Sequence, residues 1–163
     1  MTRKNQVFTK SLDSISLYPS RILIVQTIYS FDILEERKSL QEILHEYIEY
    51  HELKYPKDSL DNKFYHQLTH FIIDNKVRID KKIILKLAHN WTIKRLPALV
   101  LSILRAGIGD IINGVLLKNL KTSILINDYL QITKSLNHFS ELSFINSVLD
   151  AIAKDELLKS NVS

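Results

Sequence analysis

The feature that most constrains this chain is an apolar stretch at residues 95–112, in which only Arg95, Arg105 and Asp110 carry a charge. As a helix, the stretch places leucine, isoleucine and valine side chains at i, i+3 and i+4 spacing, with more apolar residues on its flanks. A strand of this length would be unusual, and alanine and leucine favour helix. A helix that is apolar over most of its circumference must be surrounded by other elements. We therefore predict that this stretch is the central helix of an all-α domain.

Three residues with special backbone properties lie in this stretch. Pro97 suits the first turn of a helix, where its missing N–H costs no hydrogen bond. Gly107 and Gly109 either weaken the end of the helix or admit a neighbouring helix closely, and both interpretations stay open. The two charges inside the stretch, Arg105 and Asp110, predict first an internal ion pair, and second a part of the surface that meets a partner. Asn113-Gly114 predicts the end of the helix.

The composition is typical of one soluble globular domain. The 163 residues are 45% apolar and 25% charged, and three glycines and three prolines are too few for closely spaced strands. Arg105 and Asp110 interrupt the best candidate for a membrane span, and the amino terminus lacks the apolar block of a signal peptide. We expect a soluble, cytoplasmic protein without a membrane partner. The net charge of +4 tolerates a nucleic-acid partner without indicating one.

Hydrophobic periodicity and capping signals predict about seven helices in total. The first runs over 21–34 after a cap at Ser20, with Ile22, Val25, Ile28 and Tyr29 on its apolar face. The other starts are marked by a capping box at Ser39 to Glu42 and by signals near Ser59, at Ile79-Asp80, at Thr122-Ser123 and at Ser140 or Glu141. We predict a flexible basic arm at 1–18, a single all-α domain at 19–158 and a disordered tail at 159–163.

Few residues suggest catalysis or metal binding. The chain has no cysteine, which excludes disulfides, thiol catalysis and thiolate metal sites. His66, His70 and Asp74 stand at i, i+4 and i+8 on one predicted helix, a spacing that a metal site could use. A solvated or structural histidine pair explains them more simply. The chain also lacks a glycine-flanked serine and a phosphate-binding loop. We predict no enzyme activity, no metal and no cofactor.

Two late segments resemble the carboxy-terminal signature of the NusB family of transcription antitermination factors. The first, at 126–134, is Ile-Asn-Asp-Tyr-Leu-Gln-Ile-Thr-Lys, and the second, at 144–150, is Phe-Ile-Asn-Ser-Val-Leu-Asp. Their spacing matches the family without a gap. Further matches upstream keep the family's order, namely 21–32 with Gln26 and Ile28-Tyr29, Ile79-Asp80 with Ile83, Trp91, 95–97 and 103–105.

The resemblance implies an all-α helical bundle of two packed subdomains and a non-enzymatic role. The implied partners are boxA-type single-stranded RNA, mainly of ribosomal RNA operons, the ribosomal protein NusE and the RNA polymerase antitermination complex. The implied RNA contacts are a basic arm and the first helix, which correspond here to Arg3, Lys4, Lys10, Arg21, Gln26 and Tyr29. Single-stranded RNA needs positive charges that bind its phosphates and a flat ring on which its unstacked bases can lie. The basic arm and Tyr29 could supply the two. Two alternatives stay open for these residues: Arg21 is a plain solvated arginine, and Tyr29 belongs to the core. The protein is either a monomer or a homodimer.

This chain also departs from the family pattern. Its first helix is poorer in arginine than is usual, and Val100 and Leu101 replace a charged pair, which indicates either a repacked core or an altered docking surface. We expect Asn146 and Asp150 to be structural, with the asparagine capping or cross-linking helices. An alternative function is a divergent NusB-like protein-interaction module with weakened RNA binding. A NusB-like domain fused to a ribosomal RNA methyltransferase is disfavoured, because a glycine-rich cofactor loop and a cysteine nucleophile are absent.

Overall fold

The computed structural model describes residues 16–34 and 37–161. Across these residues the chain forms seven α-helices and three short 3-10 turns, and no strand. The all-α prediction, with about seven helices, is therefore confirmed. The helices are α1 (Tyr18–Leu34), α2 (Leu40–Lys54), α3 (Asn62–Asp74), α4 (Lys76–Lys86), α5 (Ala98–Leu116), α6 (Thr122–Ser135) and α7 (Leu142–Ser160), and the 3-10 turns are η2 (Lys57–Ser59), η3 (Ile93–Arg95) and η4 (Phe139–Glu141).

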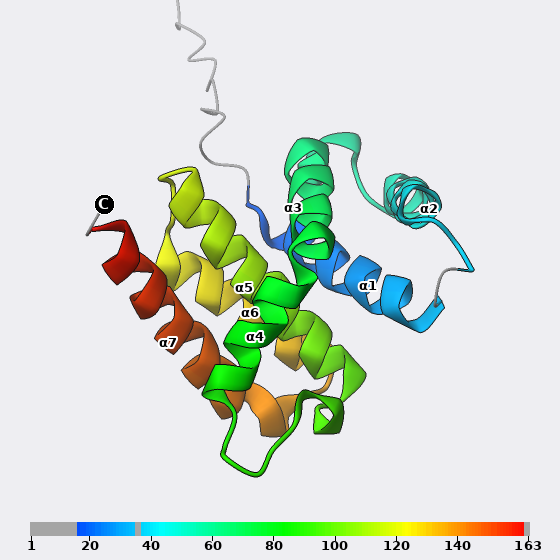
Figure 1. The fold of residues 1–163 in the computed structure, drawn as a ribbon. Coiled ribbons are helices and arrows are strands. Elements are labelled where there is room, and N and C mark those ends of the chain that lie inside the picture. Colours follow the sequence, from blue (N-terminus) through cyan, green and yellow to red (C-terminus); the bar gives the residue numbers. More distant parts are fainter. Residues whose placement is uncertain (1–15, 35–36, 162–163) are drawn as a thin grey trace, which may run out of the picture.

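The apolar helix α5 is the centre of the packing, as its sequence predicts. It contacts α1, α3, α4, α6 and α7, and Figure 1 shows it passing between the other helices. Every residue from 102 to 112 is buried. Val100 is fully buried and Leu101 packs against the core from its edge. The uncharged pair at 100–101 therefore belongs to the packing of the interior.

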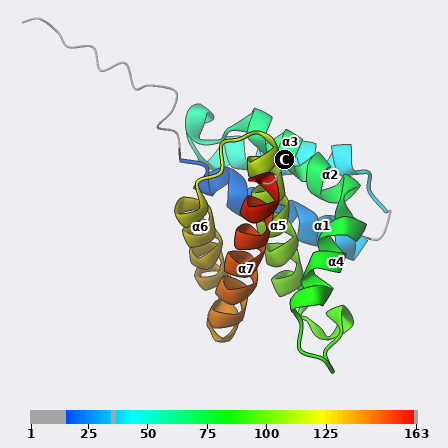
Figure 2. The same ribbon diagram turned by 60° about the vertical axis from the view of Figure 1, so that its left-hand side comes forward.

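Two groups of helices pack against each other through α5. Helices α1, α2 and α3 form the first group, in which α1 contacts both of the others. Helices α4 to α7 form the second, and Figure 2 shows α5, α6 and α7 side by side with the first group across one end. Contacts of α1 and α3 with α5, and of α1 with α6, join the groups. This arrangement matches the predicted pair of packed subdomains.

The glycines of α5 allow close approach of neighbouring helices. A Cβ atom on Gly107 would lie 2.8 Å from Leu149 Cδ2 of α7, and one on Gly109 would overlap Ile72 of α3. Neither glycine lies near the helix end, so the close-approach interpretation is confirmed. The predicted end at Asn113-Gly114 is wrong, because α5 continues to Leu116. Gly114 instead faces Leu120, which folds back against the last turn.

Several predicted helix boundaries shift. The capping box of α2 is confirmed, since the Ser39 side chain accepts from the Glu42 N–H and the Glu42 carboxylate accepts from the Ser39 N–H. Helix α1 begins at Tyr18, so Ser20 lies inside it, buried, and its Oγ accepts from the Asp61 N–H at 3.0 Å. Helix α4 begins at Lys76 and ends at Lys86, so the predicted cap at Asp80 is wrong. Helix α7 continues to Ser160, two residues beyond the predicted domain end.

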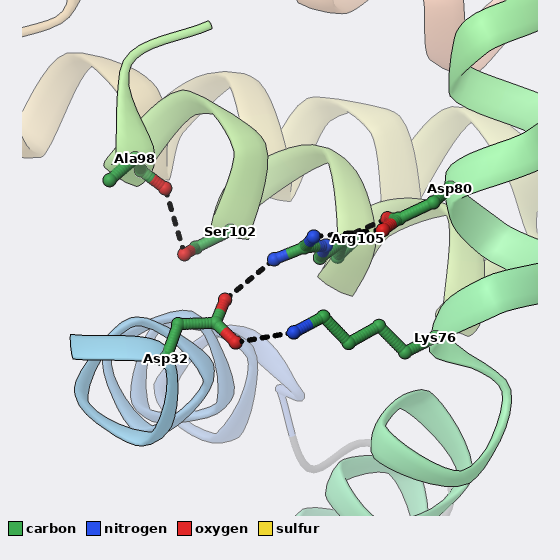
Figure 3. A network of polar contacts seen from close by, with 6 residues as sticks. All are labelled: Asp32, Lys76, Asp80, Ala98, Ser102 and Arg105. Atoms are coloured by element: carbon green, nitrogen blue, oxygen red, sulfur yellow. Dashed lines mark hydrogen bonds and ion pairs between the residues drawn. The ribbon is translucent and has the colours of Figure 1, made fainter. Parts of the chain in front are cut away.

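The predicted ion pair between Arg105 and Asp110 is also wrong, although both residues are buried and paired. Arg105 donates from Nε and Nη2 to the Asp80 carboxylate at 2.8 and 2.9 Å, and from Nη1 to Asp32 at 2.6 Å. Figure 3 shows this network, in which Lys76 also reaches Asp32. Arg105 thus connects α5 with α1 and α4. Asp110 lies more than one helical turn further along α5 and pairs elsewhere.

One helix among the described residues, α5, is long and apolar enough to cross a membrane by length and composition alone. The charges of Arg105 and Asp110 do not prevent it from meeting this criterion, contrary to the expectation from sequence. However, 67% of its apolar stretch is buried by the surrounding helices. The packing is that of a core helix.

Candidate functional site

The start of α1 is fixed to α5 and α6 by the buried side chain of Arg21. Its Nε donates to Asp110 Oδ2 at 2.7 Å, and its Nη1 donates to Asp128 Oδ2 at 2.8 Å. Tyr129 Oη donates to the same Asp110 oxygen at 3.0 Å. The guanidinium also lies over the Phe64 ring of α3, 5.6 Å from its centroid. Four helices are therefore held together at this point.

Burial and charge act in opposite directions on the groups of this network. Burial lowers the pKa of Arg21, but the charge of Asp110 and the hydrogen bonds to the two carboxylates raise it more, so its pKa lies above the ordinary value. Burial raises the pKa of Asp110, and its bonds with Arg21 and Tyr129 only partly offset that rise. Burial, followed by the charge of Asp110, holds the pKa of Tyr129 well above its usual value. Arg21 and Tyr129 are therefore both protonated at neutral pH.

The outward face of α1 carries a mixed stripe. Ile22, Gln26, Tyr29 and Ile33 recur at i, i+4, i+7 and i+11, which places them on one side of the helix. Tyr29 is 37% exposed and Ile33 is 55% exposed, whereas Ile22 and Gln26 are half-buried. The predicted apolar face is confirmed for Val25 and Ile28, which are buried, and Ile22 packs against the core from its edge. Tyr29 is the exception, because it is exposed. The buried residues of α1 are Ser20, Arg21, Leu23, Ile24, Val25, Thr27 and Ile28.

The structure separates the six candidate RNA contacts into three groups. Arg3, Lys4 and Lys10 lie outside the described residues. Gln26 and Tyr29 share the outward stripe of α1, and neither side chain bonds to a described residue. Arg21 lies on a different side of the helix, 6% exposed, with both carboxylate partners in place. Sequence reasoning missed Asp128 as its partner, because the two residues lie 107 positions apart.

A cavity of about 720 Å³ opens beside this network, between the start of α1, α3, the end of α5 and the start of α6. We call it the α1/α6 cavity. Arg21, Asp110 and Asp128 form part of its wall. The other side chains that define its chemistry are Lys63, Phe64, Gln67, Asn113, Leu117, Asn119, Lys121 and Ile124. The sequence gives no signal for this cavity, because four separate elements contribute to its walls.

A second cavity of about 590 Å³ lies at the other end of α5, and we call it the η3 groove. It is lined mainly by apolar residues, including Leu87, Trp91, Leu96 and Phe144, with Lys86, Arg95 and Glu141 among its charged residues. Trp91 is 48% exposed. The groove therefore presents a mainly apolar surface.

The remaining sequence candidates do not gather into a site. Within residues 16–34 and 37–161, no cluster of three metal-ligating side chains occurs, and His70 Nε2 lies 3.2 Å from Gln41 Nε2 instead. The expected helix cross-link by Asn146 is wrong, because that side chain is exposed and bonds to no described residue. Asp150 forms a surface ion pair with Lys154 at 2.9 Å.

These observations define an all-α protein built around a buried central helix, with its polar network and both cavities at helix ends. A family model described as the NusB family matches residues 18–154. The chain belongs to the NusB family. The matched region spans all the helices except the last turns of α7.

Curated relatives agree with this assignment. The chain is similar to the transcription antitermination protein NusB of Caulobacter vibrioides, with 29% identity over 143 residues that cover 83% of this chain and 91% of the relative. It is also similar to the protein of the same name from Rhizobium etli, at 28% identity over 83% of this chain and 84% of the relative.

Solved structures share the fold. The NusB structure of T. maritima aligns with a TM-score of 0.71 at 21% identity, covering 85% of this chain and 91% of that one. A crystal structure of the antitermination factors NusB and NusE in complex with dsRNA aligns with a TM-score of 0.69 at 22% identity, covering 85% of this chain and 96% of that one.

Proposed function

We propose that this protein is a transcription antitermination factor that binds boxA-type RNA together with NusE, within the RNA polymerase antitermination complex, mainly on ribosomal RNA operons. The observation that carries the proposal is the family match over residues 18–154, which includes the whole α5-centred core. Curated relatives with this name align over most of their own length, and a solved NusB and NusE structure contains RNA. The role is one of binding rather than catalysis, and the protein acts in the cytoplasm.

For the RNA contacts, we propose Gln26 and Tyr29 on the outward stripe of α1, with Arg3, Lys4 and Lys10 supplying cations for phosphates. The exposed part of the Tyr29 ring offers a flat surface on which an unstacked base can lie. Arg21 enters this proposal as a residue that positions α1, because its guanidinium already bonds to Asp110 and Asp128. It holds the start of α1 against α5 and α6.

The second candidate function is a NusB-like protein-interaction module with weakened RNA binding. One observation favours it: both ion pairs of Arg21 are internal, so this arginine at the start of α1 offers no free charge to a phosphate. In that case, the apolar η3 groove would be the main functional surface.

A reconstituted transcription assay separates the two functions. The template carries a boxA element ahead of a terminator, and the control template carries the same bases in scrambled order. With NusE and the other antitermination proteins present, the first function predicts that this protein increases read-through on the boxA template alone. Equal read-through on both templates would favour the second function.

A further inference from the structure

We propose that the α1/α6 cavity receives an unstacked base of the bound single-stranded RNA, an inference that rests on the proposed RNA-binding function. At about 720 Å³, the cavity falls within the roughly 300–1,000 Å³ range of sites for small organic ligands. Its lining includes residues at the start of α1 and in the connection from α5 to α6. A base with part of its sugar and phosphate fits such a space.

Three amide side chains in this cavity have free hydrogen-bonding groups. Gln67 and Asn119 are exposed and Asn113 is half-buried, and none of the three side chains bonds to a described residue. Each amide offers two donors and an acceptor, which is the combination that base edges require. Gln67 comes from α3, Asn113 from α5 and Asn119 from the connection that follows α5. They therefore approach the cavity from different sides.

The cavity also has exposed apolar walls. Leu117 and Ile124 are 60% and 55% exposed, although both line the cavity. The faces of a base are apolar and its edge is polar. One base can therefore cover Leu117 and Ile124 with a face while its edge bonds to the amides. Two features of the backbone fix the position of this wall. Lys118 has a φ of 55°, and Leu120 packs against Gly114.

The charged side chains that line this cavity are Arg21, Lys63 and Lys121 on the positive side and Asp61, Asp110 and Asp128 on the negative side. Asp61 caps α3 by accepting from the Phe64 N–H at 2.9 Å, and Asp110 and Asp128 accept from Arg21. Lys63 and Lys121 are exposed and form no ion pair with a described residue. They are free to contact the phosphates on either side of a bound base. An acidic peptide could form ion pairs with the two lysines, but it has no flat apolar face that would cover Leu117 and Ile124.

The test compares two double variants in anisotropy titrations with labelled boxA-type RNA. Q67A/N119A removes two base contacts, and we expect it to weaken binding about tenfold with an unchanged salt dependence. K63Q/K121Q removes two phosphate contacts, and we expect it to reduce the slope of log affinity against log salt by about 1.4. Q131A is the matched control, because Gln131 is an exposed amide on α6 outside the cavity, and its affinity should not change.

Acetylation of lysines provides a second measurement that does not depend on a variant. Bound RNA should protect Lys63 and Lys121 of the wild-type protein, whereas Lys81 on the exposed side of α4 should react as before. Wild-type affinity in both double variants, or protection of the two lysines by NusE alone, would overturn the base-binding proposal. Absence of RNA binding by the wild-type protein would overturn the proposed function itself, so the two failures are distinguishable.

Discussion

Arg21 shows how burial changes the role of a basic residue at the start of a helix. The sequence places a lone arginine at the start of α1, and the fold places two carboxylates and a tyrosine around it. Its partners lie 89 and 107 positions away, in α5 and α6. No local pattern indicates such a pairing. The sequence therefore predicts a positive charge at the start of α1, but it does not predict that Asp110 and Asp128 pair with it.

Replacing Arg21 with methionine should strongly destabilise the protein. The change leaves Asp110 and Asp128 without their cation, and removing one member of a buried ion pair typically costs about 3–5 kcal/mol. Urea unfolding measures the loss. The control is K154M, which breaks the exposed pair with Asp150 and should change the stability little, because water and salt screen such a pair. Equal losses in the two variants would show that the Arg21 network contributes little.

At the scale of elements, the approach of α3 to α5 depends on a missing side chain at Gly109. We predict that G109A destabilises the fold by about 1–2 kcal/mol, because a Cβ atom there overlaps Ile72 and the overpacking cost exceeds the gain in helix propensity. Thermal unfolding followed by circular dichroism measures the change. G107A is the comparison, since its Cβ would crowd the flexible end of Leu149 and make an ordinary contact with Tyr129. A larger loss for G107A would contradict this explanation.

The capping box of α2 should make stability depend on pH in the acidic range. The Ser39 N–H donates to the Glu42 carboxylate and lowers the pKa of Glu42 below its ordinary value. A lowered folded pKa contributes stability above the unfolded pKa, and this contribution disappears as pH falls through the folded pKa. E42Q keeps an acceptor but does not titrate.

Unfolding free energies of the wild type and of E42Q, measured from neutral pH to below pH 4, test this expectation. The wild type should lose stability relative to E42Q as the solution becomes acidic. E52Q, at an exposed position of α2 without a described ion pair, should follow the wild type throughout. Parallel curves for E42Q and the wild type would rule out a role for the titration of Glu42.

Helix identity was easier to predict than helix boundaries. Apolar periodicity identifies all seven helices, because each must bury a face against α5 or a neighbour. Ile79-Asp80 has the pattern of a helix start, yet Asp80 lies within α4, where its carboxylate bonds to Arg105. An acidic residue that pairs with a distant arginine has the same local pattern as one that caps a helix.

At the scale of the whole molecule, the architecture follows from α5. Its apolar circumference requires neighbours on several sides, and the amphipathic stretches of the rest of the chain provide them. The resemblance over 126–134 and 144–150 predicts the family, which the match over 18–154 confirms. The cavities were not predictable, because residues from four elements, such as Gln67 and Asn119, approach one another only after folding.

The measurement that tests the central claim most directly is the anisotropy of labelled boxA-type RNA against a scrambled control, with and without NusE, at two salt concentrations. The account predicts that boxA-type RNA binds more tightly than the control, that NusE strengthens this preference, and that affinity falls as salt rises. If neither RNA binds, with or without NusE, the protein has the NusB fold without the RNA-binding function, and the account is contradicted.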